Sequence, residues 1–142
     1  MPAKRRFRLF DERGVAAVEF VVVAGLLAAM LFLIIDMGLM MSANLVLTQA
    51  AREGARRAAI EGGATPGAFQ RIESQAAAGR LDLDRLQMDI KPKQASYGTI
   101  INVRVDYDYR FHSPFLRRLA GDPFPLRVEM SARSERLDPR EP

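Results

Sequence analysis

The feature that most constrains this chain is a 21-residue apolar segment near its N-terminus. Residues 15–35 read VAAVEFVVVAGLLAAMLFLII, and Glu19 is the only charged side chain among them. A helix of this length covers about 30 Å, the thickness of the hydrocarbon core of a bilayer. A surface helix of a soluble protein would show a polar stripe, and residues 20–35 have none. The segment therefore predicts a transmembrane helix.

The charges that flank this segment predict its orientation. Residues 1–14 form a basic leader, and the first basic residue after the segment is Arg52. The positive-inside rule places such a leader in the cytoplasm and the C-terminal part of the chain outside. A cleaved secretory signal is the alternative. Its apolar region would be about 7–15 residues long and followed by a small-x-small site, whereas this run is longer and Asp36-Met37-Gly38 is a poor site.

Composition excludes several classes of function. The net charge is +4, and the leader holds +3 of it as five basic and two acidic residues, so no basic face for nucleic acid is expected. The chain has no cysteine, which excludes zinc–thiolate, iron–sulfur and cysteine-nucleophile chemistry. His112 is the only histidine and is expected to be a solvated loop residue. No G-x-S-x-G or phosphate-binding loop is present. We therefore expect no enzymatic activity, catalytic residue, cofactor, metal or small-molecule substrate.

Glu19 is the unexpected residue, since hydrocarbon is a poor solvent for a carboxylate. It could snorkel to the headgroups or be protonated at the interface. If the chain were cut between Gly14 and Val15, however, Val15 would carry a free α-ammonium group. Glu19 would then lie about 6 Å further along the same helix face. The two charges could pair within one chain or between neighbouring chains, which is far more favourable than either charge alone in low dielectric.

The stretch RGVAAVEF, residues 13–20, resembles a type IV prepilin processing site. Gly14, Val15, Glu19 and Phe20 fall in the matching register, and in that group a membrane prepilin peptidase cuts after the glycine. Together with IIDMG and LTQAAREGARRAA further on, the first 60 residues resemble the TadE-like family of pseudopilins of the tight-adherence (Tad/Flp) pilus system. That family often has a proline several residues after the Glu-Phe pair, and this chain has none there.

The resemblance implies a TadE-like minor pilin or pseudopilin, a single-pass component of Tad/Flp pilus assembly that is processed after Gly14. Its implied partners are the membrane, the prepilin peptidase, and other pilin or pseudopilin subunits and pilus assembly proteins. Its implied location is the bacterial inner membrane, with a cytoplasmic N-terminus and a periplasmic or extracellular domain. An uncleaved single-pass envelope protein with an extracytoplasmic binding or scaffold domain is the alternative. A secreted soluble domain is a third reading.

Residues 36–135 are expected to form an extracytoplasmic domain that begins with a continuation of the membrane helix, over residues 36–61. Small residues recur on it at four-residue spacing, a helix-packing stripe of Ala50, Gly54 and Ala58. The stripe could pack under the domain's own sheet or against a helix of another subunit. Glu53 and Arg57 have the spacing of an ion pair on the same helix. Gly62-Gly63 should end the helix, and a second helix is predicted over residues 66–79.

The hydrophobic period then changes from 3.6 to 2. Apolar and polar residues alternate over residues 86–91, 99–111 and 125–135, which predicts three half-buried antiparallel strands. One apolar face of this sheet needs a cover, and the long helix can supply it. The predicted fold class is therefore α+β, a long N-terminal helix on a three-stranded sheet, as in pilins. A short apolar turn with Phe115, Leu116 and Leu119 either caps the sheet or faces a partner. Residues 136–142 are expected to be a disordered tail.

Overall fold

The computed structural model describes residues 12–137. Most of the predicted leader, residues 1–14, and most of the predicted tail, residues 136–142, lie outside the described residues. The chain forms two units, which meet between Ile35 and Asp36. The first is the apolar helical segment, and the second is an α+β unit that contains all of the sheet.

Helix α1 (Glu12–Glu61) is 50 residues long and belongs to both units. No proline occurs within it, so nothing interrupts its backbone hydrogen bonds. It ends where Gly62 and Gly63 adopt φ angles of 81° and 125°, which glycine reaches without steric cost. The amides of both glycines donate to the carbonyl of Ala58, at 2.8 and 2.9 Å, and so satisfy the end of the helix.

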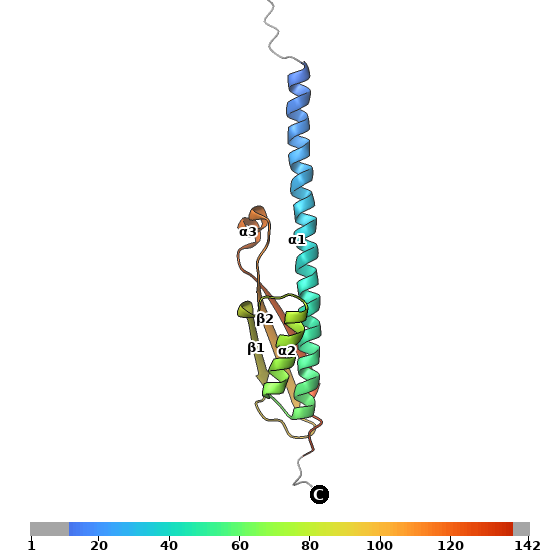
Figure 1. Ribbon diagram of the computed structural model, residues 1–142, viewed down its shortest axis with the longest axis vertical. Coiled ribbons are helices and arrows are strands. Elements are labelled where there is room, and N and C mark those ends of the chain that lie inside the picture. The colour runs from blue at the N-terminus through green and yellow to red at the C-terminus, as the bar shows by residue number, and fades with distance from the viewer. Residues whose placement is uncertain (1–11, 138–142) are drawn as a thin grey trace, which may run out of the picture. The chain divides into compact units, whose positions relative to one another are not determined.

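Three strands form one antiparallel sheet in the order β1-β2-β3 (Figure 1). They are β1 (Leu86–Lys91), β2 (Ile100–Tyr109) and β3 (Phe124–Arg133). The central strand places Val105 opposite Met88 of β1 and Val128 of β3. Helix α2 and the part of α1 within the second unit cover the same face of the sheet. The predicted α+β architecture, a long N-terminal helix packed on a three-stranded antiparallel sheet, is confirmed.

Two shorter helices complete the second unit. Helix α2 (Pro66–Ala78) begins after Thr65, whose hydroxyl accepts a hydrogen bond from the amide of Ala68 at 3.3 Å. A 3₁₀ turn, η1 (Leu83–Arg85), leads into β1. Helix α3 (Pro114–Ala120) connects β2 to β3 and ends at Gly121, whose φ is 89°.

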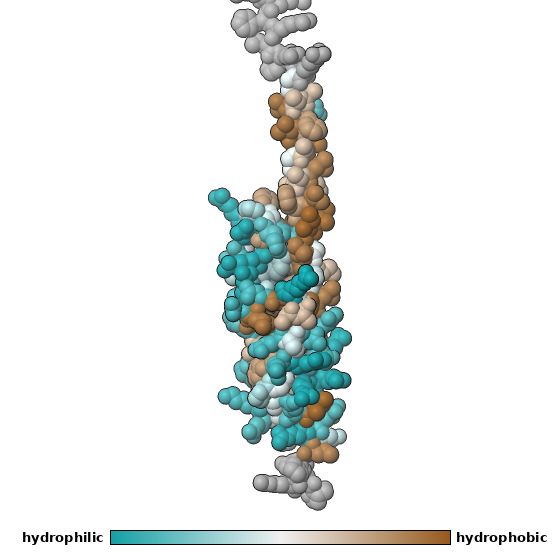
Figure 2. Space-filling view, viewed as in Figure 1, coloured by the Kyte–Doolittle hydropathy of each residue, from teal (hydrophilic) through white to brown (hydrophobic). Residues whose placement is uncertain are grey.

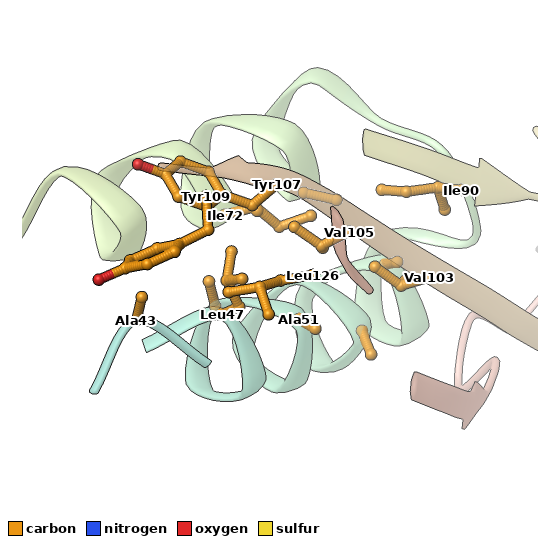
Figure 3. Packing of buried hydrophobic residues seen from close by; sticks show 14 of the residues in the cluster. Ala43, Leu47, Ala51, Ile72, Ile90, Val103, Val105, Tyr107, Tyr109 and Leu126 are labelled. Atoms are coloured by element: carbon orange, nitrogen blue, oxygen red, sulfur yellow. The ribbon is translucent and has the colours of Figure 1, made fainter. Parts of the chain in front are cut away.

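The core lies between the sheet and the two longer helices (Figure 3). Leu47 of α1 and Ile72 of α2 are fully buried in it. The row of side chains that the alternation predicted to face inward is buried at every position: Ile101, Val103, Val105, Tyr107, Tyr109 and Phe111. Alanines supply most of the α1 contribution, so the helix backbone can approach the sheet and α2 closely.

Candidate functional site

The apolar segment of α1 is exposed along its whole length. Among residues 15–35 only Ala24 is even partly covered by protein, and Figure 2 shows hydrophobic side chains gathered along this segment. It is the one helix among residues 12–137 that is long and apolar enough to cross a membrane. Water cannot solvate such a surface favourably, whereas the hydrocarbon of a bilayer can.

The predicted processing residues lie at the beginning of α1. Gly14 is the third residue of the helix, and a Cβ added to it would meet no atom within 4 Å. Val15, Glu19 and Phe20 are exposed in the same way. Val15 and Glu19 lie about one turn apart on one face of the helix, so the spacing assumed for a charge pair is present. Within residues 14–137 no protein group covers these positions.

The small-residue stripe, in contrast, is buried inside the second unit. Ala50, Gly54 and Ala58 are all covered. A Cβ on Gly54 would overlap Ile72 of α2, lying 2.6 Å from its Cδ1 atom. The stripe therefore packs within its own chain, where Gly54 allows α2 to approach α1. The first of the two predicted alternatives named the sheet as the covering surface, and at Gly54 that surface is α2.

The predicted ion pair between Glu53 and Arg57 is wrong. The Glu53 carboxylate lies 3.5 Å from Arg71 of α2 and 3.9 Å from Arg56. Arg57 instead pairs with Glu61, at 2.6 Å. The four-residue spacing on α1 allows Arg57 to pair with either Glu53 or Glu61. The pairing of Glu53 with Arg71 depends on the approach of α2, which the spacing on α1 does not reveal.

Asp36 is a buried acid for which the sequence predicted no contact with the rest of the chain. It is 1% exposed, and its two carboxylate oxygens accept hydrogen bonds from the backbone amides of His112 and Ser113, at 3.1 and 2.8 Å. Bonds from an N–H group to an ionised carboxylate are about twice as strong as neutral ones. Asp36 thus holds the segment that enters α3. The side chain of His112 is exposed, as expected, with Nδ1 3.6 Å from the same carboxylate.

Tyr109 lies in the core near this acid. Its hydroxyl is buried and has no hydrogen-bond partner among the described residues. Burial raises the pKa of Tyr109, and the negative charge of Asp36 raises it further. Both effects favour the neutral phenol over the phenolate. The two residues make an electrostatically unfavourable pair whenever the tyrosine ionises.

The predicted apolar turn forms helix α3, and its three apolar residues differ in burial. Leu116 is buried and attaches the helix to the core, whereas Phe115 and Leu119 are exposed. One side chain therefore caps the end of the sheet, and the other two form an exposed apolar patch.

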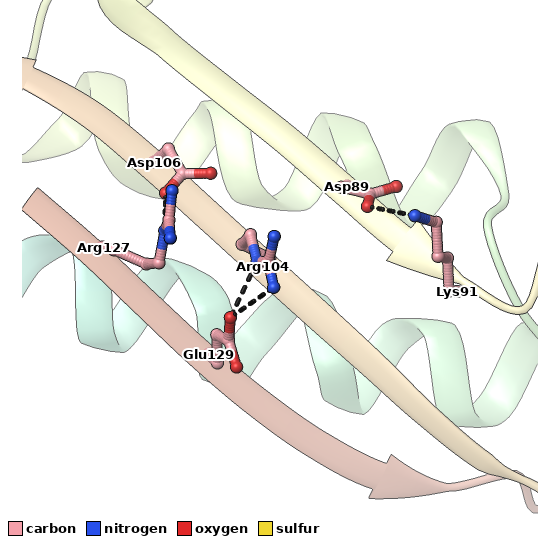
Figure 4. A network of polar contacts seen from close by, with 6 residues as sticks. All are labelled: Asp89, Lys91, Arg104, Asp106, Arg127 and Glu129. Carbon is pink, nitrogen blue, oxygen red and sulfur yellow. Dashed lines mark hydrogen bonds and ion pairs between the residues drawn. The ribbon is translucent and has the colours of Figure 1, made fainter. Parts of the chain in front are cut away.

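The outer face of the sheet carries ion pairs (Figure 4). Arg104 of β2 bonds to Glu129 of β3 at 2.7 Å. Asp106 accepts a hydrogen bond from Arg127 of β3 at 2.5 Å. That contact raises the pKa of the exposed Arg127 guanidinium. Asp108 lies opposite Pro125 of β3, so no cation is paired with it on that strand.

No group of three or more potential metal ligands occurs within residues 12–137. The second unit has packed helices, a paired charged face on the sheet and an exposed apolar patch on α3. These features suit binding to other macromolecules or to lipid.

Comparison with known proteins gives one match. The sequence model of the TadE-like protein family matches residues 14–56. The match covers all four predicted processing residues, the apolar segment and Asp36. The predicted resemblance is thus confirmed for this part of the chain. No curated protein and no solved structure matched the chain.

Proposed function

We propose, from the TadE-like sequence of residues 14–56, that this chain is a minor pilin-like component of Tad/Flp pilus assembly. It crosses the bacterial inner membrane once through residues 15–35, with its N-terminus in the cytoplasm. Its role is structural rather than enzymatic, and its partners are other pilin or pseudopilin subunits and assembly proteins. The observation that carries the proposal is that the family match begins at Gly14 and includes the whole exposed apolar helix.

We propose further that a prepilin peptidase cuts the bond between Gly14 and Val15. This bond lies in the first turn of α1, where backbone amides have no helical partner and the helix frays at little cost. A glycine in the helix lowers its stability by about 1 kcal/mol relative to alanine. Local unwinding would therefore expose the bond to the peptidase while the apolar helix beyond it stays intact.

Cleavage after Gly14 would also explain why a carboxylate, Glu19, lies within the apolar segment. The new α-ammonium group of Val15 would lie on the same helix face as Glu19, one turn away. A charge pair in hydrocarbon is far less costly than an isolated carboxylate. The pair could form within one chain, or the carboxylate of one subunit could hold the terminus of its neighbour during assembly.

The N-terminus of the membrane-extracted protein tests the cleavage. Intact mass and N-terminal sequencing should find a species that starts at Val15 when the prepilin peptidase is active, and the full-length chain when it is deleted. Gly14→Leu should block cutting, and Gly25→Leu is the matched control because both positions have open space around them. If every molecule keeps residues 1–14 in cells with active peptidase, the alternative of an uncleaved envelope protein replaces this proposal.

Variants of Glu19 test the pairing. Glu19→Ala should be cut normally and should fail to assemble, as measured by recovery of the subunit with pilus components after crosslinking. The double variant Val18→Glu/Glu19→Val keeps the charge but turns it by about 100° around the helix, so it should not restore assembly. Normal assembly by Glu19→Ala would refute the pairing role and leave the cleavage result standing.

A further inference from the structure

Helix α3 is attached to the chain at the end of the apolar segment. Asp36 directly follows Ile35, the last residue of that segment. Its carboxylate binds the amides of His112 and Ser113, the two residues that precede α3. The Asp36 side chain is almost completely buried, and the two bonds to it are partly buried. The segment that enters α3 is therefore attached to Asp36, the residue that directly follows the apolar segment in the chain.

The outer face of α3 is apolar. Leu116 is 3% exposed and points into the core, while Phe115 is 64% and Leu119 73% exposed. These two residues are four positions apart and so lie on one face of the helix. Among residues 12–137 nothing covers them. Two large apolar side chains side by side on a seven-residue helix are unfavourable in water and favourable at the boundary between headgroups and acyl chains.

The same segment is positively charged. Residues 114–121 contain Arg117 and Arg118 and no acid, whereas Arg110 pairs with Asp122 at 3.9 Å. Arg117 and Arg118 form no ion pair with an acid in the described part of the chain, and Arg117 donates only to the carbonyl of His112, at 3.3 Å. Arginines beside exposed apolar side chains match the layer of phosphates that lies above the acyl chains of a membrane.

We infer that α3 is an interfacial contact of this protein with the membrane. Phe115 and Leu119 insert at the acyl boundary of the bilayer that holds residues 15–35, and Arg117 and Arg118 bind lipid phosphates. A second protein is a poorer occupant, because two side chains offer far less than the roughly 800 Å² per partner that a stable interface buries. The inference rests on the membrane insertion in the proposed function and not on cleavage after Gly14.

Depth-dependent quenching tests this contact in the full chain, which has no native cysteine. Leu119→Cys would be labelled with an environment-sensitive fluorophore, and the protein reconstituted in phosphatidylcholine–phosphatidylglycerol vesicles. Tyr97→Cys is the matched control, since Tyr97 is 63% exposed and precedes the start of β2, whereas α3 follows its end. These ends are about 33 Å apart along a ten-residue strand. Leu27→Cys reports insertion of the apolar segment itself.

The label at Leu119 should lose most of its fluorescence to a nitroxide near the acyl boundary and little to aqueous iodide, and the label at Tyr97 should do the opposite. Equal access of iodide to both labels would overturn the inference. Protection of the Leu119 label from both quenchers would also overturn it, because a protein would then cover α3. If aqueous iodide quenches the Leu27 label, membrane insertion itself fails. If the Leu27 label is protected from iodide but the Leu119 label escapes the lipid quencher, the proposed function stands and this contact does not.

The arginines are tested separately. Arg117→Gln combined with Arg118→Gln should reduce lipid quenching of the Leu119 label in vesicles that contain phosphatidylglycerol. The same pair of substitutions should have a smaller effect in phosphatidylcholine alone. Since both residues are exposed, they should leave the fold unchanged, which circular dichroism can check. Quenching that does not respond to the two substitutions would overturn the phosphate contact.

Discussion

Removing the carboxylate of Asp36 should release α3 from the rest of the second unit. In Asp36→Ala the amides of His112 and Ser113 lose acceptors that now lie 3.1 and 2.8 Å away. A hydrogen bond to a charged group contributes about 1.5–3 kcal/mol. Two such bonds give about 3 kcal/mol at the lower end, which we adopt because the variant also avoids the desolvation of a buried charge.

Amide hydrogen exchange measures this change directly in the full chain. A loss of about 3 kcal/mol corresponds to roughly 100-fold faster exchange, since each 1.4 kcal/mol is a factor of ten. The peptide that covers residues 110–121 should show this increase in Asp36→Ala. Asp36→Asn keeps one acceptor oxygen and turns an NH₂ group toward the other amide. Asp36→Asn should therefore lose about half of the free energy that the two hydrogen bonds contribute, and residues 110–121 should exchange roughly tenfold faster than in the unsubstituted protein.

Asp89→Ala is the control for loss of a negative charge. Asp89 is an exposed acid of β1 that pairs with Lys91 at 2.9 Å, and such surface pairs contribute at most about 1 kcal/mol. Its removal should leave exchange in residues 110–121 unchanged. Equal amide exchange rates of residues 110–121 in Asp36→Ala and Asp89→Ala would refute this role of Asp36.

Two further predictions concern the core and its titration. Gly54→Ala should overlap Ile72 and destabilise the second unit by about 1–3 kcal/mol. The control Gly38→Ala, whose added Cβ would meet no atom within 4 Å, should be neutral or stabilising by up to about 1 kcal/mol. Thermal unfolding in micelles distinguishes the two variants, and equal melting temperatures would contradict the packing role of Gly54. Tyr109→Phe removes a buried hydroxyl that has no partner in the described chain, so it should raise the melting temperature. Because burial and Asp36 raise the pKa of Tyr109 above 10.0, the folded state holds this proton more tightly than the unfolded state. The contribution of this proton to the free energy of unfolding is fully present below the pKa of Tyr109 in the unfolded state. It is lost as the pH rises through the pKa of Tyr109 in the folded state. Tyr109→Phe should lack this part of the alkaline destabilisation, and an identical alkaline decline in both proteins would argue against it.

The sheet could be predicted from the sequence because the alternation of a strand is a local property. In TIINVRVDYDYRF every second residue is apolar, and each of these residues from Ile101 to Phe111 is buried. The apolar segment was equally clear, since its length and lack of charge depend on no other part of the chain. The end of α1 could also be predicted, because Gly62 and Gly63 adopt backbone angles that other residues avoid.

The roles of Asp36 and Glu53 could not be predicted in this way. The partners of Asp36 are 76 and 77 residues away, and no spacing rule connects them. The available signal was a lone acid at the end of an apolar run, where burial requires a partner. Glu53 meets Arg71 only because α2 folds back on α1. For α3, the composition predicted an apolar turn but could not show that Leu116 points inward and Phe115 outward.

The paired charges on the sheet have a consequence for any assembly that contains this chain. Asp89, Lys91, Arg104, Asp106, Arg127 and Glu129 are three acids and three bases, and each is already neutralised by a neighbour. A subunit that covered this face would have to strip water from all three pairs without offering them better partners, which is unfavourable in a low dielectric. The face also has too little net charge to attract a partner over distance. In any assembly that contains this chain, we therefore expect this face of the sheet to remain exposed to water.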